Sequence, residues 1–252
     1  MQGHTATTEE QFGRAAAAYL TSAVHREGAD LQAAAAVFPE DAEVLDLGCG
    51  AGHVSYALAQ RVRRVTAYDL SPRMLDVVQA EAARQGLTNL VTQQGGAEAL
   101  PFADASFDGV TTRYSAHHWL DIRGAIREMR RVLKPGGKVV VIDIVAPPNP
   151  LLDTHLQALE LLRDGSHLRD YTVAEWTGML ADEGLNVESQ SFWKLPMDFV
   201  PWVERMGTQP EFVSALRLLL RQAPTEVREY FAVQEDASFA IDAMMLQAVL
   251  GR

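Results

Sequence analysis

Cysteine, long apolar runs and clustered positive charge are all scarce in this sequence. The single cysteine, Cys49, has no partner for an internal disulfide, so nothing points to an oxidising compartment. No apolar run approaches the roughly 18–20 residues of a membrane span. Residues 1–10 lack the basic and then apolar pattern of a secretory signal. We therefore expect a cytoplasmic protein with no membrane partner.

The charge balance is acidic. Lysine and arginine number 22 against 33 aspartates and glutamates, which gives a formal net charge of −11. Because a protein that binds a phosphate backbone needs clustered basic residues, we expect no nucleic-acid partner, whereas a cationic ligand is compatible with this charge. The length of 252 residues and the hydrophobic content of 48% allow one elaborated globular domain or two small ones.

Apolar runs and helical segments alternate through the first part of the chain. The predicted strands are Glu43–Leu47, Arg64–Asp69, Leu90–Gln93, Phe107–Arg113 and Lys138–Ile144. The predicted helices between them are His53–Arg61, Pro72–Gln85 and Ile122–Leu133. This spacing indicates βαβ units, hence a parallel sheet with right-handed crossovers.

Helical segments dominate both flanks. Helices are predicted at Thr8–His25 and Gly28–Phe38, and, beyond a proline-rich stretch, at Leu151–Arg163, at Thr172–Glu183 and in two or three pieces over Asp198–Tyr230. Asn186–Lys194 is a predicted strand, and we interpret Ser238–Val249 as the last strand, with a helix as the alternative. Most of six large apolar residues are expected in the core, a few alternatively in a wall for an aromatic acceptor: Trp176, Phe192, Trp193, Phe199, Trp202 and Met206.

The most informative segment is VLDLGCGAG at residues 44–52, a strand that ends in a glycine-rich turn. Asp69 ends the next strand about 20 residues after Gly48, a spacing at which an acid accepts the ribose hydroxyls of an adenosine. A dinucleotide fingerprint needs glycine where this chain has His53, and Asp46 would repel a pyrophosphate. Asp46 suits an ammonium group instead, which favours S-adenosylmethionine (SAM). A tight turn without a ligand is the alternative.

At this point the sequence resembles the class I SAM-dependent methyltransferases, and within them the ubiquinone/menaquinone-type small-molecule branch (methyltransferase domain family 11-like). The residues that carry the resemblance are VLDLGCGAG (44–52), YDLS (68–71) with Met74, GGAEALPF (95–102), SFD (106–108) and RVLKPGG (131–137). It implies an α/β, Rossmann-like fold: a mostly parallel seven-stranded sheet, helices on both faces and a helical insertion before the last strand. One domain would span 1–252, with a helical cap (1–40), a SAM-binding core (41–146) and acceptor-side helices and C-terminal strands (147–252).

The resemblance also implies roles for individual residues. Asp46 would orient the SAM ammonium, Asp69 would hold the ribose, and Leu70 would pack on the adenine. Where the family often has an acid this chain has Gly96, which leaves the Ala97 N–H and Glu98 to contact the adenine edge; a plain loop at 95–96 is the alternative. The expected cofactor-binding set is Tyr19, Asp46, Gly48, Cys49, Gly50, Asp69, Leu70, Gly96, Ala97, Glu98 and Arg113.

Two histidines, His117 and His118, follow the fourth strand, where ligands of open α/β sheets lie. An imidazole has an ordinary pKa of about 6.5, which suits a base, so we name both as catalytic candidates; packing or binding is the alternative. No metal is expected, because adjacent side chains diverge and no Cys or His cluster completes a site. For the second polar stretch, Arg163–Tyr171, we favour a solvated loop between helices over a substrate loop.

The resulting hypothesis is an enzyme that transfers a methyl group from SAM to a nitrogen, oxygen or carbon atom of a small-molecule acceptor by in-line displacement, leaving S-adenosylhomocysteine. The alternative is a SAM-binding protein that does not transfer methyl, either a regulator or a SAM-dependent isomerase or pericyclase. A protein or nucleic-acid methyltransferase is a third hypothesis, and the acidic charge argues against nucleic acid. The sequence leaves open whether the protein forms a homodimer.

Overall fold

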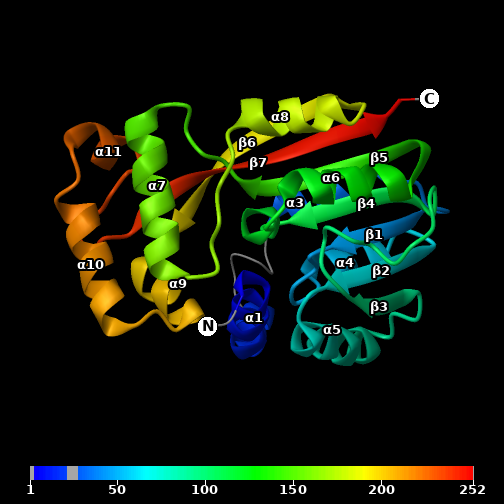
Figure 1. The fold of residues 1–252 in the computed structure, drawn as a ribbon. Helices are drawn as coiled ribbons and strands as arrows, with labels where there is room; N and C mark the ends of the chain where they lie inside the picture. Colours follow the sequence, from blue (N-terminus) through cyan, green and yellow to red (C-terminus); the bar gives the residue numbers. More distant parts are fainter. Residues whose placement is uncertain (1–2, 22–27, 252) are drawn as a thin grey trace.

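A computed structural model describes residues 3–21 and 28–251; within the first helix, the side chains of residues 14–19 and 21 lie outside the description. In the described chain, seven strands form one sheet in the order β3-β2-β1-β4-β5-β7-β6 (Figure 1). They are β1 (Glu43–Leu47), β2 (Arg64–Asp69), β3 (Leu90–Gln94), β4 (Phe107–Arg113), β5 (Leu133–Ile144), β6 (Leu185–Met197) and β7 (Phe239–Leu250). Neighbours among β1–β5 pair in parallel, and β7 is antiparallel to β5 and β6. The predicted mostly parallel sheet is confirmed.

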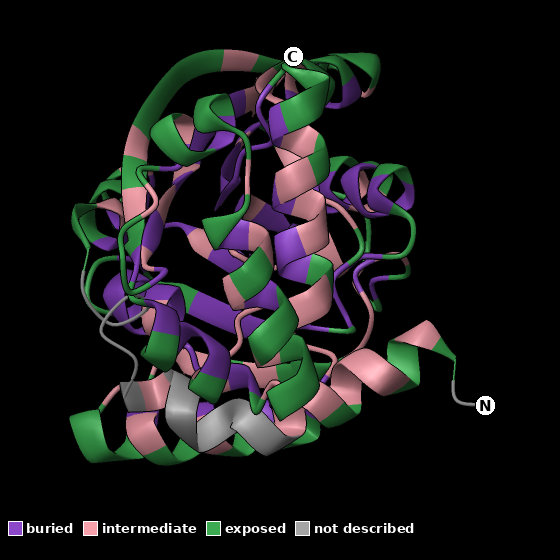
Figure 2. Ribbon diagram, turned by 90° about the vertical axis from the view of Figure 1, so that its left-hand side faces the viewer, coloured by how far each residue is buried: buried purple, intermediate pink, exposed green. Residues whose placement is uncertain are grey.

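Helices cover both faces of this sheet, as predicted. The helical elements are α1 (His4–Thr21), α3 (Ala29–Ala36), α4 (His53–Ala59), α5 (Pro72–Gln85), the 3₁₀ turn η1 (Ala116–His118), α6 (Ile122–Val132), α7 (Pro150–Arg163), α8 (Val173–Asp182), α9 (Phe199–Met206), α10 (Pro210–Arg221) and α11 (Thr225–Tyr230). Buried residues of α3, α4 and α5 pack on one face, and those of α6 and α8 on the other. Figure 2 shows the result, with buried strands in the middle and exposed outer helix surfaces.

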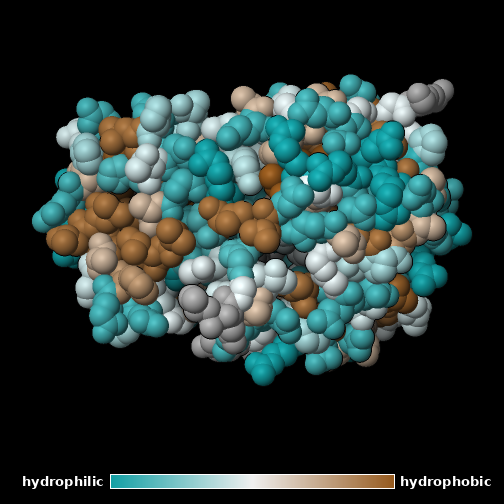
Figure 3. Space-filling model, viewed as in Figure 1, coloured by the Kyte–Doolittle hydropathy of each residue, from teal (hydrophilic) through white to brown (hydrophobic). Residues whose placement is uncertain are grey.

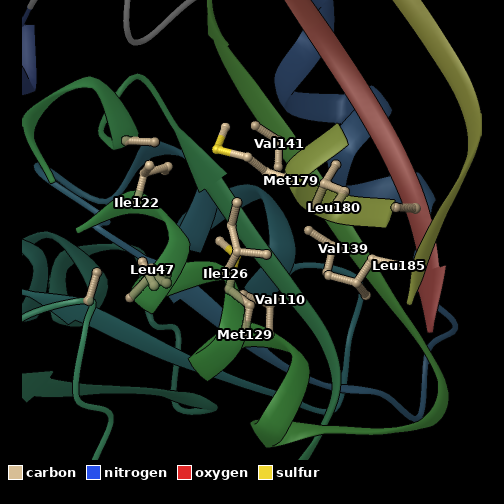
Figure 4. Packing of buried hydrophobic residues seen from close by; sticks show 14 of the residues in the cluster. Leu47, Val110, Ile122, Ile126, Met129, Val139, Val141, Met179, Leu180 and Leu185 are labelled. Carbon is tan, nitrogen blue, oxygen red and sulfur yellow. The ribbon is translucent and has the colours of Figure 1, made fainter. Parts of the chain in front are cut away.

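β5 illustrates why the strands are apolar along their whole length. Val139 and Val141 pack against α6 and α8 (Figure 4), while Val140 and Ile142 face the side of α3 and α4. Successive side chains of a strand point to opposite faces, so a strand covered on both sides has no polar alternation. Burial of such side chains, at about 25 cal/mol per Å² of apolar surface, provides the main stabilisation.

A second apolar core forms beyond the parallel sheet. The pairing of β5 with β7 ends at Ile144, but β6 and β7 continue together to the Met197–Phe239 pair. The protruding ribbon carries α7, α9, α10 and α11 (Figure 1), whose buried side chains include Leu156, Trp202, Leu216 and Val227. The predicted helical insertion before the last strand is confirmed. Figure 3 shows apolar side chains gathered over this helical group.

Some predicted boundaries and environments need correction. α1 begins at His4 rather than Thr8, and its predicted end, His25, lies outside the described residues. Phe192, expected in the core, is 55% exposed. Successive side chains of the edge strand β6 point to opposite faces, so Phe192 points outward because Trp193 packs inward. The interpretation of 238–249 as a strand is confirmed by β7. Among the described residues, no helix combines the length and apolar character that crossing a bilayer requires.

A T-x-x-E capping box at the start of α8 yields a stability prediction. The Thr172 side chain accepts a hydrogen bond from the Glu175 N–H (3.1 Å), and the Glu175 carboxylate accepts one from the Thr172 N–H (2.8 Å). We expect Thr172→Ala to lower the free energy of unfolding by about 1 kcal/mol, measured by urea denaturation, with Thr172→Ser close to wild type. An unchanged unfolding midpoint in the alanine variant would contradict this.

Candidate functional site

The glycine-rich turn after β1 has a backbone that only glycine accommodates easily. Gly48 and Gly50 have φ angles of 70° and 51°, in the left-handed region. A Cβ on Gly48 would lie 2.0 Å from the Ser115 side-chain oxygen, so the turn also approaches the segment after β4 closely. A Cβ on Gly50 would meet nothing within 4 Å, because this residue borders a cavity.

This cavity lies at the carboxyl ends of β1, β2 and β4, and α1 forms part of its wall. The predicted site residues that line it are Asp46, Gly48, Cys49, Gly50, Asp69, Leu70, Gly96, Ala97, Glu98, Arg113 and His118. Tyr19 falls among the side chains that are outside the description. His4, Thr8 and Phe12 of α1 also line the cavity. These three residues are not predictable from the sequence, because no local motif surrounds them.

Backbone hydrogen bonds fix the Asp69 carboxylate at the cavity wall. Its Oδ2 accepts from the Gly50 N–H and its Oδ1 from the Ser71 N–H, both at 2.8 Å. Burial raises the pKa of this carboxyl group, while the two hydrogen bonds oppose the rise. Each carboxylate oxygen has a further lone pair, so Asp69 can accept from two neighbouring hydroxyl groups.

Asp46 is buried inside β1, and its carboxyl group borders the same cavity. Burial raises its pKa to about 7; a hydrogen bond from the Ser55 hydroxyl (2.5 Å) opposes the rise and the nearby Asp69 charge adds to it. A cation beside Asp46 would favour the ionised form. Asp46 is therefore suited to an ammonium group and unsuited to a phosphate.

Contacts between segments far apart in sequence hold other parts of the cavity wall in place. Glu98 accepts a hydrogen bond from the Leu120 N–H (3.1 Å), which ties the loop after β3 to the start of α6. The Tyr68 hydroxyl donates to the Gly96 carbonyl (3.2 Å). Arg113, which lines the cavity, forms a buried ion pair with Asp30 (2.6 Å), so it ties the cavity wall to α3. The Cys49 thiol stays protonated, since burial raises its pKa.

The two histidine candidates occupy different places. His118 lines the cavity, where Phe12 packs edge-on against its ring at 4.7 Å between centroids. Its Nδ1 lies 3.0 Å from the Ser166 carbonyl oxygen, which only accepts hydrogen bonds, so Nδ1 carries the hydrogen and Nε2 keeps its lone pair. Burial, reinforced by the His117 charge, lowers the pKa of His118 to about 3. The ring is therefore neutral near pH 7.

His117 is not among the residues that line the cavity. Its Nδ1 donates to Asp143 at 2.6 Å and lies 3.8 Å from Asp170. Burial lowers the pKa of His117, but the charge and hydrogen bond of Asp143 outweigh that effect and raise it to about 9. The Asp143 carboxylate also accepts from the Ala116 and Ile144 N–H groups. His117 is consequently a buried, ion-paired neighbour of His118.

The preferred interpretation of residues 163–171 as a solvated loop is wrong. Asp164, Ser166, His167 and Asp170 are all buried. The loop packs beneath η1, where the N–H groups of residues 168 and 169 both donate to the His117 carbonyl. These four polar side chains are shielded from water, whereas the Arg169 side chain is 39% exposed, a difference that composition alone does not reveal.

Comparisons with known proteins identify relatives of this chain. A family model described as a methyltransferase domain matches residues 45–141. The chain is 47% identical to YafE of Escherichia coli (strain K12), over 80% of this chain and 97% of that protein. It is 35% identical to YcgJ of Bacillus subtilis (strain 168), described as a methyltransferase, over 96% and 99% of the two chains. A crystal structure of YcgJ superposes with a TM-score of 0.85 at 34% identity, covering 88% of this chain and 98% of YcgJ.

A shorter match reaches a demethylmenaquinone methyltransferase of Lactococcus lactis subsp. lactis (strain IL1403). It is 38% identical over 47% of each chain. The similarity to this enzyme is thus confined to about half of the chain, whereas the matches to YafE and YcgJ include the segments beyond β5.

Proposed function

The chain belongs to the methyltransferase domain family of class I methyltransferases, and on that premise we propose that it transfers the methyl group of SAM to a nitrogen, oxygen or carbon atom of a small-molecule acceptor. The observation that carries the proposal is the pair of carboxylates on the two sides of the glycine turn, the buried Asp46 and the half-buried Asp69. A pyrophosphate would be repelled there, while SAM offers an ammonium group to one acid and a ribose diol to the other.

The residues present fit this cofactor. Asp69 has two fixed oxygens for the sugar hydroxyls, Asp46 has a carboxyl group for the ammonium, and Leu70 provides an apolar surface for the adenine. Gly48 and Gly50 leave the space that side chains would occupy. Gly96, Ala97 and Glu98 border the same cavity and stay our candidates for the adenine edge.

SAM, when bound, supplies an electrophilic methyl group on a positively charged sulfur. Phe12 and Trp119 contribute apolar surface to the cavity wall, which would help to exclude water around the bound cofactor. His118 offers the Nε2 lone pair to the acceptor N–H or O–H, with its tautomer fixed by Ser166. Its low pKa is compatible with this role, because His118 gains a positive charge as the cavity loses that of the sulfonium, so the total charge stays constant.

A small-molecule acceptor is supported by the acidic net charge and by the similarity to a demethylmenaquinone methyltransferase. We assign residues 1–40 to a cap and residues 147–252 to the acceptor side. The two parts meet where the Gln11 side chain of α1 donates to the Met206 carbonyl of α9 (2.9 Å). That contact holds α1, and with it His4 and Phe12, against the cavity.

The test is incubation of the purified chain with isotopically labelled SAM and a small-molecule extract. We expect S-adenosylhomocysteine to form together with a labelled product of low molecular mass. SAM binding by calorimetry without S-adenosylhomocysteine in any extract would favour the alternative of a SAM-binding protein that does not transfer methyl.

The raised pKa of Asp46 leads us to expect that cofactor binding depends on pH. Because its pKa is about 7 in the free protein, about half of the carboxyl groups are protonated at pH 7, and an ammonium ligand drives that proton off. We expect affinity for S-adenosylhomocysteine to rise between pH 6 and 8, with proton release visible by calorimetry in buffers of different ionisation enthalpy. Ser55→Ala removes a bond that lowers this pKa and should increase the release. Equal release by both proteins would contradict the assignment.

A further inference from the structure

Three segments far apart in sequence bring together side chains of the types that bind metal ions, close to His118. His117 comes from η1, Asp143 from the end of β5, and Asp170 from the loop before α8, and one donor atom of each lies within 4.8 Å of the others. Their side chains are 13%, 2% and 1% exposed. The two carboxylates are therefore buried and His117 is half-buried, unlike the acidic groups common on protein surfaces.

Asp170 is the unusual member of this cluster. Within the described residues, neither of its carboxylate oxygens has a hydrogen-bond partner, although both are buried. The nearest basic atoms are His117 Nδ1 at 3.8 Å and His167 Nε2 at 3.9 Å. His117 Nδ1 donates to Asp143, and His167 Nε2 lies 3.0 Å from the Gln157 side-chain oxygen, so neither serves Asp170. A buried carboxylate without a partner is costly, which calls for a cation.

Further unpartnered acceptors lie on the same loop. His167 Nδ1 and Asp164 Oδ2 are buried without hydrogen-bond partners among the described residues. The ring centroids of His167 and His117 lie 5.7 Å apart, with the two ring planes tilted by 39° to each other. The loop thus contributes more hydrogen-bond acceptors than donors to this region. An anion needs donors and an apolar ligand needs neither, so neither ligand suits this region.

We propose that His117, Asp143 and Asp170 bind a divalent transition-metal cation. One imidazole and two carboxylates suit Mn²⁺, Fe²⁺ or Zn²⁺ better than Ca²⁺ or Mg²⁺, which prefer oxygen ligands alone. The cation takes the place of the hydrogen on His117 Nδ1. Metal–ligand bonds of about 2.1 Å place adjacent donor atoms about 3.0 Å apart in an octahedral site and about 3.4 Å apart in a tetrahedral one. His117 Nδ1 and Asp143 Oδ1, now 2.6 Å apart, therefore need to separate by less than about 1 Å.

The sequence predicted no metal because only neighbouring histidines were visible, and those diverge. The three ligands here come from segments that only the fold brings together. A cation at this position links η1, β5 and the loop whose Ser166 carbonyl fixes the tautomer of His118. Its role is to position the loop, and the proposal does not depend on the identity of the methyl acceptor.

The test is titration of the chelator-treated chain with MnCl₂, followed by electron paramagnetic resonance of free Mn²⁺. We expect one saturable site per chain, a rise in melting temperature, and nitrogen modulation in the echo spectrum from a coordinated imidazole. Asp170→Asn should weaken Mn²⁺ binding by at least about 100-fold. Asp182→Asn, an exposed acid paired with Arg123, is the matched control and should bind like wild type.

If Asp170→Asn fails to fold, the imidazole signal of the wild-type chain and its loss in His117→Gln decide the matter. Absence of a saturable Mn²⁺ site, binding without nitrogen modulation, or Asp170→Asn affinity within about threefold of wild type would each overturn the proposal. Because binding and melting are measured without SAM, failure here leaves the proposed methyl transfer untouched.

Discussion

Replacing Asp69 by alanine is expected to weaken binding of SAM and S-adenosylhomocysteine by at least about 100-fold. Each charge-assisted hydrogen bond to a sugar hydroxyl is worth about 1.5–3 kcal/mol, and two at the lower value already correspond to a factor of about 100. The variant also removes the acceptor of the Gly50 and Ser71 N–H groups, which loosens the turn that borders the cavity. Isothermal titration calorimetry with S-adenosylhomocysteine measures the effect directly.

Asp108→Asn is the matched control for this variant. Asp108 accepts from the Glu43 N–H and pairs with Lys134, near the start of β1 and away from the glycine turn at its end. Its amide variant should keep wild-type affinity. If Asp69→Ala keeps its fold by circular dichroism and binds within about threefold of wild type, Asp69 does not hold the ribose.

The core of the fold and the first half of the site are predictable because their signals are local. A strand, a turn and the next strand place Gly48, Gly50 and Asp69 by covalent connection, and the parallel topology then brings their ends to one edge. The start of α5, predicted at Pro72, is local too: the Ser71 side chain accepts a hydrogen bond from the Met74 N–H, and Pro72 occupies the first turn. Such features depend on a few adjacent residues.

The part of the site around His118 depends on contacts between segments far apart in sequence. His4 donates to the His118 carbonyl (3.1 Å), and Ser166 fixes the same histidine from the other side. Neither contact has a periodicity or spacing that reveals it. The prediction of a solvated loop at 163–171 is wrong for the same reason, because polar residues predict exposure to solvent unless a buried polar partner is known. His117 and His118 are adjacent in the chain, yet their surroundings differ completely.

The difference between the two histidines leads to the second large effect. His118→Ala is expected to lower methyl transfer by about 100-fold, the lower end of what general bases contribute, while affinity for S-adenosylhomocysteine stays within about threefold. The loss falls on turnover because the Nε2 lone pair is needed only when the acceptor gives up its proton. Transfer from labelled SAM to small molecules measures turnover, and calorimetry measures affinity. His155→Ala, on α7 outside the cavity lining, serves as the matched control and should be neutral.

The pH dependence separates this role from simple packing. Burial lowers the pKa of His118 to about 3, so the ring stays neutral well below the ordinary histidine value. At saturating SAM, turnover of the wild-type protein should therefore show no loss of a histidine base near pH 6.5. His118→Gln preserves much of the volume but lacks a basic nitrogen, and it should be as slow as His118→Ala. Wild-type turnover in the His118→Gln variant would show that His118 only fills space. A fall in wild-type turnover near pH 6.5 that is absent from His118→Ala would show that the His118 ring is not shielded from water.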